Sequence, residues 1–159
     1  MAEAQSEGTG RSLFANVVVA IDDSPESLGA IDAIMPSVKA VDGHLAVVFV
    51  RHRPIMFDSV GVDSANAWEL VEESIEAREH NAERDATARL ASSGIPATFV
   101  VREGDPGREI LQVAKDHDAT AVALGSTVHG AIGSILVSSV TEYLLHHCPV
   151  PLIIIRSPS

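Results

Sequence analysis

Short, continuously apolar runs rich in Val and Ile alternate with segments of helical periodicity along almost the whole chain. This alternation is the strongest constraint on what the chain can fold into. Apolar runs of this length are typical of parallel strands that are buried on both faces of a sheet. The runs that predict strands are residues 16–22, 44–51, 97–102, 120–124 and 150–155. The sequence therefore predicts an α/β domain, in which helices cross over between parallel strands.

Helical periodicity marks four of the segments between these runs. The first carries Leu28, Ile31 and Val38 on one face, and the second is longer, with an apolar stripe that begins at Trp68. We expect Trp68 to be a core residue. Ser or Asp at a helix start supplies a capping oxygen, and Pro presets the backbone angle. The expected starts are Ser24 with Pro25, Asp105 with Pro106, and Ser139.

Composition narrows the class of protein. The 159 residues include 11 Lys and Arg against 22 Asp and Glu, a net charge of -11, which argues against a nucleic-acid partner. No apolar stretch approaches the roughly 18 residues of a membrane span, and no segment has the pattern of a secretion signal. The single cysteine, Cys148, fits a reducing compartment. We expect a polar lead over residues 1–11 and one cytoplasmic domain over residues 12–159.

Motifs of common enzyme classes are missing from the chain. The glycine spacing after the fourth predicted strand is that of a P-loop, but Ala131 and Ile132 stand where its Lys and its Ser or Thr are needed. Dinucleotide-binding, serine-hydrolase and zinc motifs are also absent. A phospho-accepting receiver domain could use Asp22 and Asp23, yet it needs a Lys after its last strand, where Arg156 stands. We expect no enzymatic activity, with weak ATP hydrolysis as the one alternative.

A segment rich in Gly and Ser, residues 124–143, follows the fourth predicted strand and runs into the fourth helix. Gly125 and the later glycines permit positive φ angles and close approach of a ligand. Ser138 and Ser139 lie at the start of the helix, where the partial positive charge suits a phosphate. A second interpretation stays open, because Ser139 and Glu142 also have the spacing of a capping box that satisfies the helix's own donors.

Several separated segments resemble the universal stress protein family, over residues 13–156. The first strand continues into VVVAIDDSPES, a Gly-Asp-Pro precedes the third helix, and the chain ends in HHCPVPLIII. The second strand ends in Val48, Phe49 and Val50, where the family has an apolar residue, His and Val. The resemblance implies a Rossmann-like, doubly wound, five-stranded parallel sheet in the order 3-2-1-4-5. About four helices would complete a three-layer sandwich.

The resemblance also implies an adenine-nucleotide site, for ATP or AMP, with Mg²⁺ as a companion ion. Asp22 would contact the ribose or the base, and an apolar slot beside it suits an adenine ring. The expected nucleotide-binding residues are Ala20, Ile21, Asp22, Val50, Leu124, Gly125, Ser126, Val128, Ser138, Ser139 and Val140. Asp22 has a second interpretation, as a turn residue that caps the first helix together with Ser24.

Two positions depart from the family's G-x2-G-x9-G-[S/T] motif. Gly125 and Ser139 match its ends, but Val128 and Ser138 replace its second and third glycines. A branched side chain at Val128 disfavours a positive φ and stands where a triphosphate would approach. Two functions therefore stay open: a stress-response regulatory or adaptor module that binds an adenine nucleotide, and a nucleotide-free dimeric interaction protein of the same fold.

The last predicted strand, from Val150 to Ile155, would leave an Ile-rich edge exposed in a monomer. The family pairs its subunits through this strand, so the resemblance implies a homodimer. It also allows for a protein partner that docks on the dimer.

Overall fold

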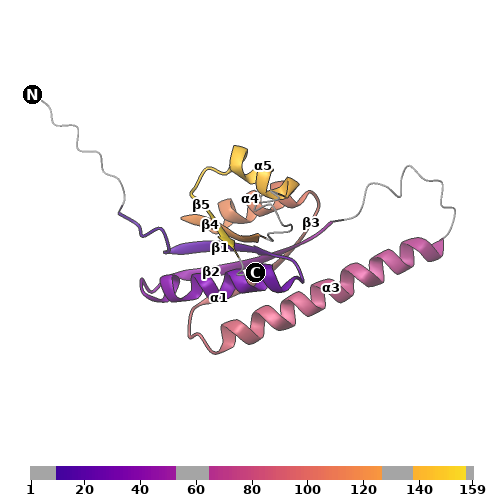
Figure 1. Ribbon diagram of the computed structural model, residues 1–159, viewed down its shortest axis with the longest axis horizontal. Coiled ribbons are helices and arrows are strands. Elements are labelled where there is room, and N and C mark those ends of the chain that lie inside the picture. Colours follow the sequence, from indigo (N-terminus) through magenta and orange to yellow (C-terminus); the bar gives the residue numbers. More distant parts are fainter. Residues whose placement is uncertain (1–9, 53–64, 127–137, 157–159) are drawn as a thin grey trace, which may run out of the picture.

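A computed structural model of the protein describes residues 10–52, 65–126 and 138–156, with the backbone alone at residues 65, 66 and 126. Helices and strands alternate along these residues as the sequence predicts (Figure 1). Their order is β1 (Asn16–Ile21), α1 (Pro25–Lys39), β2 (His44–Arg51), α3 (Ala65–Ala91), β3 (Ala97–Glu103), α4 (Pro106–Asp116), β4 (Ala121–Ser126), α5 (Ser139–His147) and β5 (Leu152–Arg156).

All neighbouring strands pair in parallel, in the order β3-β2-β1-β4-β5. The predicted fold class and strand order are therefore confirmed. Helices α1 and α3 cover one face of the sheet, and α4 and α5 cover the other (Figure 1). The strand order reverses between β1 and β4, which places the sheet's switch point beside the end of β1.

The central strand β1 explains why the apolar runs are continuous rather than alternating. Val17 and Val19 pack with the α1 and α3 side, whereas Val18 packs with the α4 and α5 side. Each of these three valines is at most 1% exposed. Because both faces are covered by helices, each of these valines packs against an apolar layer, whichever face it points to.

Strand ends differ from the prediction by a few residues. β5 begins at Leu152 rather than at Val150, after Pro149 and Pro151, which have no backbone N–H for a ladder. β4 continues to Ser126, two residues beyond the predicted end at Leu124. The strand thus carries the chain further toward the candidate ligand segment than expected.

Helix starts follow the capping residues in α1 and α4. Ser24 accepts a hydrogen bond from the N–H of Ser27, and Asp105 accepts one from the N–H of Arg108. The expectation that Trp68 is a core residue is wrong, because its side chain is 39% exposed. The amino-terminal end of α3 extends past the sheet (Figure 1), so the described strands offer no core surface to Trp68.

No helix among the described residues combines the length and the apolar run that a membrane crossing requires.

Candidate functional site

A cavity of about 430 Å³ lies at the carboxyl ends of β1, β2 and β4. Ligands of open α/β sheets bind at this edge, next to the reversal of strand order. The first turn of α5 closes one side of the cavity, and α3 contributes to another. Its described lining includes Ala20, Ile21, Asp22, Ser27, Val48, Phe49, Val50, Arg51, His52, Ile75, Arg78, Pro106, Ile110, Leu124, Gly125, Ser138 and Val140.

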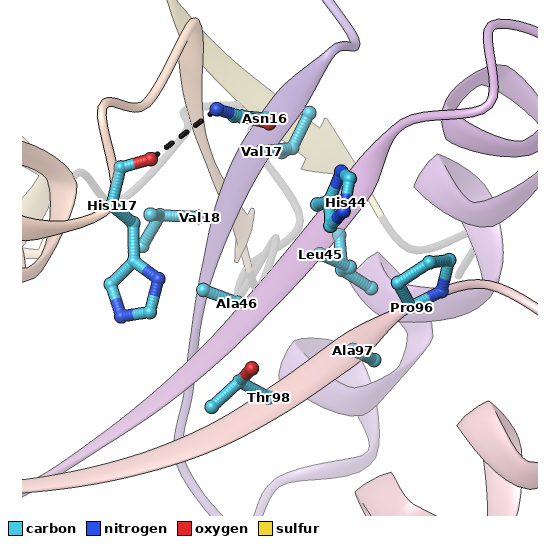
Figure 2. A pocket seen from close by; sticks show the side chains of 10 residues that line it. All are labelled: Asn16, Val17, Val18, His44, Leu45, Ala46, Pro96, Ala97, Thr98 and His117. Atoms are coloured by element: carbon cyan, nitrogen blue, oxygen red, sulfur yellow. Dashed lines mark hydrogen bonds between the residues drawn. The ribbon is translucent and has the colours of Figure 1, made fainter.

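A second hollow, of about 460 Å³, lies at the opposite edge, by the amino ends of the strands (Figure 2). Neighbouring strands contribute Val18, Ala46 and Thr98 to its wall, and His117 borders it from the end of α4. Helix carboxyl ends, with their partial negative charge, face this edge, so an anionic ligand is disfavoured there. We therefore place the candidate site at the carboxyl edge.

Most of the residues predicted to bind a nucleotide lie around the first cavity. Three do not belong to its described lining. Ser139 is exposed and is not among the described lining residues, Ser126 ends β4 with only its backbone described, and Val128 lies outside the described residues. The predicted residues that do line the cavity are Ala20, Ile21, Asp22, Val50, Leu124, Gly125, Ser138 and Val140.

Asp22 is held in a turn between β1 and α1. Its Oδ1 accepts hydrogen bonds from the backbone N–H of Ser24 at 2.9 Å and from the Ser24 hydroxyl at 2.5 Å. The backbone N–H of Asp22 donates to the Ser27 hydroxyl at 3.1 Å. The turn interpretation is thus confirmed, and the same carboxylate also borders the cavity. One group both shapes the loop and faces the space for a ligand.

The environment of Asp22 favours its charged form. Partial burial of the carboxylate raises its pKa, but hydrogen bonds from Ser24 and Ser27 and the charge of Arg78 outweigh this effect. The pKa of Asp22 therefore lies below its ordinary value of 3.8. At neutral pH the cavity presents an ionised hydrogen-bond acceptor.

Gly125 plays a different part from the one expected. It lies within β4, and its φ angle is not positive, so it makes no turn of that kind. A Cβ on Gly125 would come within 2.4 Å of the carbonyl oxygen of Glu26, in the first turn of α1. The glycine is needed because helix and strand backbones approach closely here.

Ser138 caps α5, so the alternative interpretation of Ser139 and Glu142 as a capping box is wrong. Ser138 has an extended backbone, and its hydroxyl oxygen accepts a hydrogen bond from the N–H of Thr141 at 3.1 Å. Ser139 is already the first helical residue, one position too late to serve as the cap. Since Ser138 also borders the cavity, the amino terminus of α5 lies beside the candidate ligand space.

Three basic lining residues were missed by the sequence analysis: Arg51, His52 and Arg78. Arg51 and His52 directly follow the apolar part of β2, and this position alone could have indicated them. Arg78 is one of several charged residues on the polar face of a long helix, and no local signal separates it from the others. Only the packing of α3 against the sheet brings it to the cavity.

Across the described part of the chain, no group of three or more His, Cys, Asp or Glu side chains is arranged to hold a metal ion.

The chain is similar in sequence to members of one known protein family. The model of the universal stress protein family matches residues 14–156. A universal stress protein of Thermus aquaticus is 25% identical over 145 residues, which cover 91% of this chain and 100% of the relative. A Synechocystis universal stress protein is 28% identical over 98 residues, and the match spans only 62% of either chain.

A solved structure shares the fold. A universal stress protein family protein of Arabidopsis thaliana, solved with AMP bound, superposes with a TM-score of 0.65. It is 15% identical in sequence, and the alignment covers 91% of this chain and 93% of that one. At this level of identity the likeness shows the fold alone.

Proposed function

Because the chain belongs to the universal stress protein family, we propose that it is a regulatory or adaptor module of the stress response that binds an adenine nucleotide. The observation that carries the proposal is the cavity, where an ionised Asp22, an apolar slot and the start of α5 meet. The AMP bound to the Arabidopsis protein of the same fold supports adenine as the base. We propose binding without catalysis.

The lining of the cavity suits the parts of a nucleotide. Ala20, Val50 and Leu124 are apolar and partly or fully buried, and they offer a slot for a flat aromatic base. The Asp22 carboxylate can accept hydrogen bonds from ribose hydroxyls. The amino terminus of α5, beginning after Ser138, offers backbone donors to a phosphate. We propose that Mg²⁺, where it takes part, enters with the phosphates of the ligand.

A thermal unfolding series tests this function. ATP, ADP, AMP and cyclic AMP are each added in excess, because a ligand that binds only the folded state raises the Tm. Asp22→Asn keeps an oxygen that can accept from Ser24 but removes the charge, so it should lose most of the nucleotide-induced shift. Asp32→Asn, an exposed aspartate of α1 outside the cavity lining, is the matched control and should keep the shift. The absence of a Tm shift with every nucleotide would contradict the proposal.

A second candidate function is a nucleotide-free dimeric interaction protein of the same fold. One observation favours it: β5 pairs only with β4 among the described strands, so its outer edge can pair with a second copy. Val128, at a glycine position of the family motif, favours it as well. We propose the homodimer for both functions, and we propose a cytoplasmic location, since Cys148 is a free thiol.

A further inference from the structure

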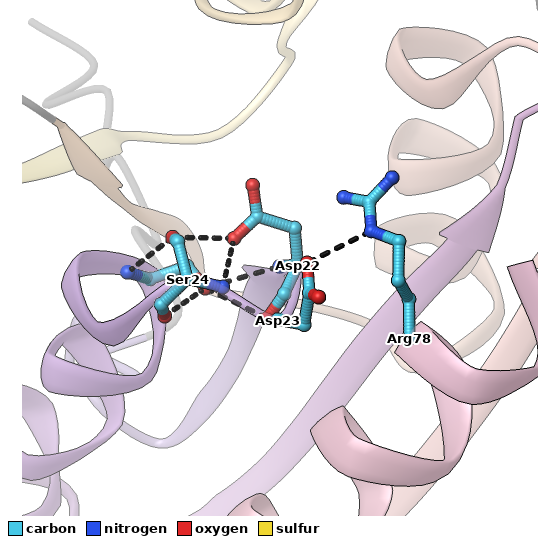
Figure 3. Close-up of polar contacts among 5 residues, drawn as sticks. Asp22, Asp23, Ser24 and Arg78 are labelled. Carbon is cyan, nitrogen blue, oxygen red and sulfur yellow. Dashed lines mark hydrogen bonds and ion pairs between the residues drawn. The ribbon is translucent and has the colours of Figure 1, made fainter. Parts of the chain in front are cut away.

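Arg78 reaches the candidate cavity from α3, on the sheet face opposite α5. Its Nε donates to Oδ1 of Asp23 at 2.9 Å, and its side chain is 50% exposed (Figure 3). No described residue accepts a hydrogen bond from either terminal nitrogen of Arg78. The guanidinium therefore keeps two parallel donors with which it can bind an anion.

Arg51 lines the same cavity, but two carboxylates already compensate its charge. Its Nε donates to Glu79, and its Nη1 lies 3.8 Å from Glu72. The hydrogen bond to Glu79 raises the pKa of Arg51. Arg78 makes one ion pair, with Asp23 through Nε, and although its charge also acts on Asp22, no described carboxylate bonds to its terminal nitrogens. Of the two arginines, Arg78 is the better placed to bind a new anion.

Asp22 and Arg78 present complementary groups to one space. Both hydrogen bonds from Ser24 end on Oδ1 of Asp22. In Figure 3 the second carboxylate oxygen of Asp22 and the terminal nitrogens of Arg78 point to the same side of the loop after β1. A hydrogen-bond acceptor beside cationic donors matches a ligand that carries hydroxyl groups next to an anionic group.

We propose that, in addition to the backbone donors at the start of α5, Arg78 supplies the cation that binds the phosphate in this cavity, and that with Asp22 it selects a phosphorylated ribose over an uncharged nucleoside. The inference rests on the nucleotide-binding function proposed above. A chain with a net charge of -11 repels phosphates at long range, so a local cation decides whether one is held. Asp23 is a positioning residue, because its bond to Nε orients the guanidinium without occupying the terminal nitrogens.

Calorimetric titration of the full chain tests the proposal with AMP, adenosine, ribose 5-phosphate and inorganic phosphate. The variants are Arg78→Gln and, as the matched control, Arg89→Gln. Arg89 lies on the same helix, and its Nε also donates to an aspartate, Asp32 of α1, at 3.2 Å. Arg89 is not among the described residues that line the cavity. Arg78→Lys keeps the charge but loses the planar pair of donors.

Arg78→Gln should lower the affinity for AMP by about tenfold or more, since charge-assisted hydrogen bonds are lost. Its affinity for adenosine should change by less than about twofold, because adenosine carries no phosphate. Arg89→Gln should leave both affinities unchanged, and Arg78→Lys should give an intermediate affinity for AMP. Ribose 5-phosphate should bind the wild-type protein more tightly than inorganic phosphate does.

The outcomes of this titration separate the role of Arg78 from the nucleotide-binding function itself. An unchanged AMP affinity in Arg78→Gln would overturn the role of Arg78 and leave the nucleotide function standing. An equal loss in Arg89→Gln would also overturn it, because the effect would then come from removing an ion pair that anchors α3 and not from losing a contact with the phosphate. Inorganic phosphate binding as tightly as AMP would overturn the selection of a ribose. If the wild-type protein bound neither AMP nor adenosine, the proposed function itself would fall, and the inference with it.

Discussion

Asp22 shows how one residue can satisfy a local and a distant requirement. The turn that it closes with Ser24 was one of two interpretations of the sequence, and the structure confirms it. The ligand contact is the other interpretation, and it remains our proposal. The two are compatible because a carboxylate has two oxygens and can accept several hydrogen bonds.

The lowered pKa of Asp22 predicts how stability depends on pH. A carboxyl group with a lower pKa in the folded state stabilises the fold at pH values above its unfolded pKa, close to 3.8. That stabilisation is lost as the pH falls from about 5 through the folded pKa, because the unfolded chain takes up the proton more readily. Asp22→Asn should therefore lower the free energy of unfolding most near neutral pH.

Urea denaturation of wild type and Asp22→Asn between about pH 3 and pH 7 checks this difference. The gap between the two unfolding free energies should narrow toward the acid end. Ser24→Ala is a useful companion variant, because it removes one hydrogen bond that lowers the pKa of Asp22. A carboxyl carbon titration by NMR should then give a higher pKa for Asp22 than in wild type. A constant gap in the first experiment would contradict the prediction.

At the scale of helices and strands, the sequence predicted the existence of every described element. The signal was strongest for β1, β2 and β4, because burial on both faces makes these central strands continuous apolar runs. Ends were predicted less well. β5 begins only after Pro151, which cannot donate a backbone hydrogen bond. At the start of α5, two adjacent serines could each cap the helix, and the sequence pattern does not distinguish between them.

The two serines give a prediction for α5. Ser138→Ala should lower the free energy of unfolding by about 1 kcal/mol, since the N–H of Thr141 loses its capping oxygen. Ser139→Ala should change it by less than about 0.5 kcal/mol, because Ser139 is exposed and caps nothing. Chemical denaturation of both variants makes the comparison. A larger loss in Ser139→Ala than in Ser138→Ala would contradict the assignment of the cap.

At the scale of the whole molecule, the order of strands was predicted from the resemblance, whereas the shape of the site was not. The carboxyl ends of β1 and β4 could be expected to lie together, because parallel strands end at the same edge of a sheet. The presence of Arg78 in the lining of the cavity could not be expected from the sequence. It depends on how α3 lies across the sheet, which no pattern along the chain encodes.

The β5 edge gives a prediction for assembly. Ile153 and Ile155 pack against the core on the α1 side, whereas Ile154 packs against neither buried cluster of the described chain. Ile154→Lys should therefore place a charge at the pairing edge while leaving the fold intact. Light scattering should give about twice 16.8 kDa for the wild-type protein and a monomer for the variant.

Leu70→Lys is the control for this experiment. Leu70 is 66% exposed, on α3 and away from β5, so the added charge should leave the dimer unchanged. A wild-type protein that is monomeric at all concentrations tested would contradict the proposed dimer.

The position of β1 in the middle of the sheet also decides when the cavity comes into existence during synthesis. Growth of the chain delivers β1, β2 and β3 first, whereas the wall formed by Leu124, Gly125 and Ser138 is made late. Until β4 emerges from the ribosome, β1 is an open edge strand and the cavity lacks one side. A ligand of this cavity can therefore stabilise the chain only after β4 and the start of α5 have been made, and its binding would distinguish such molecules from shorter fragments.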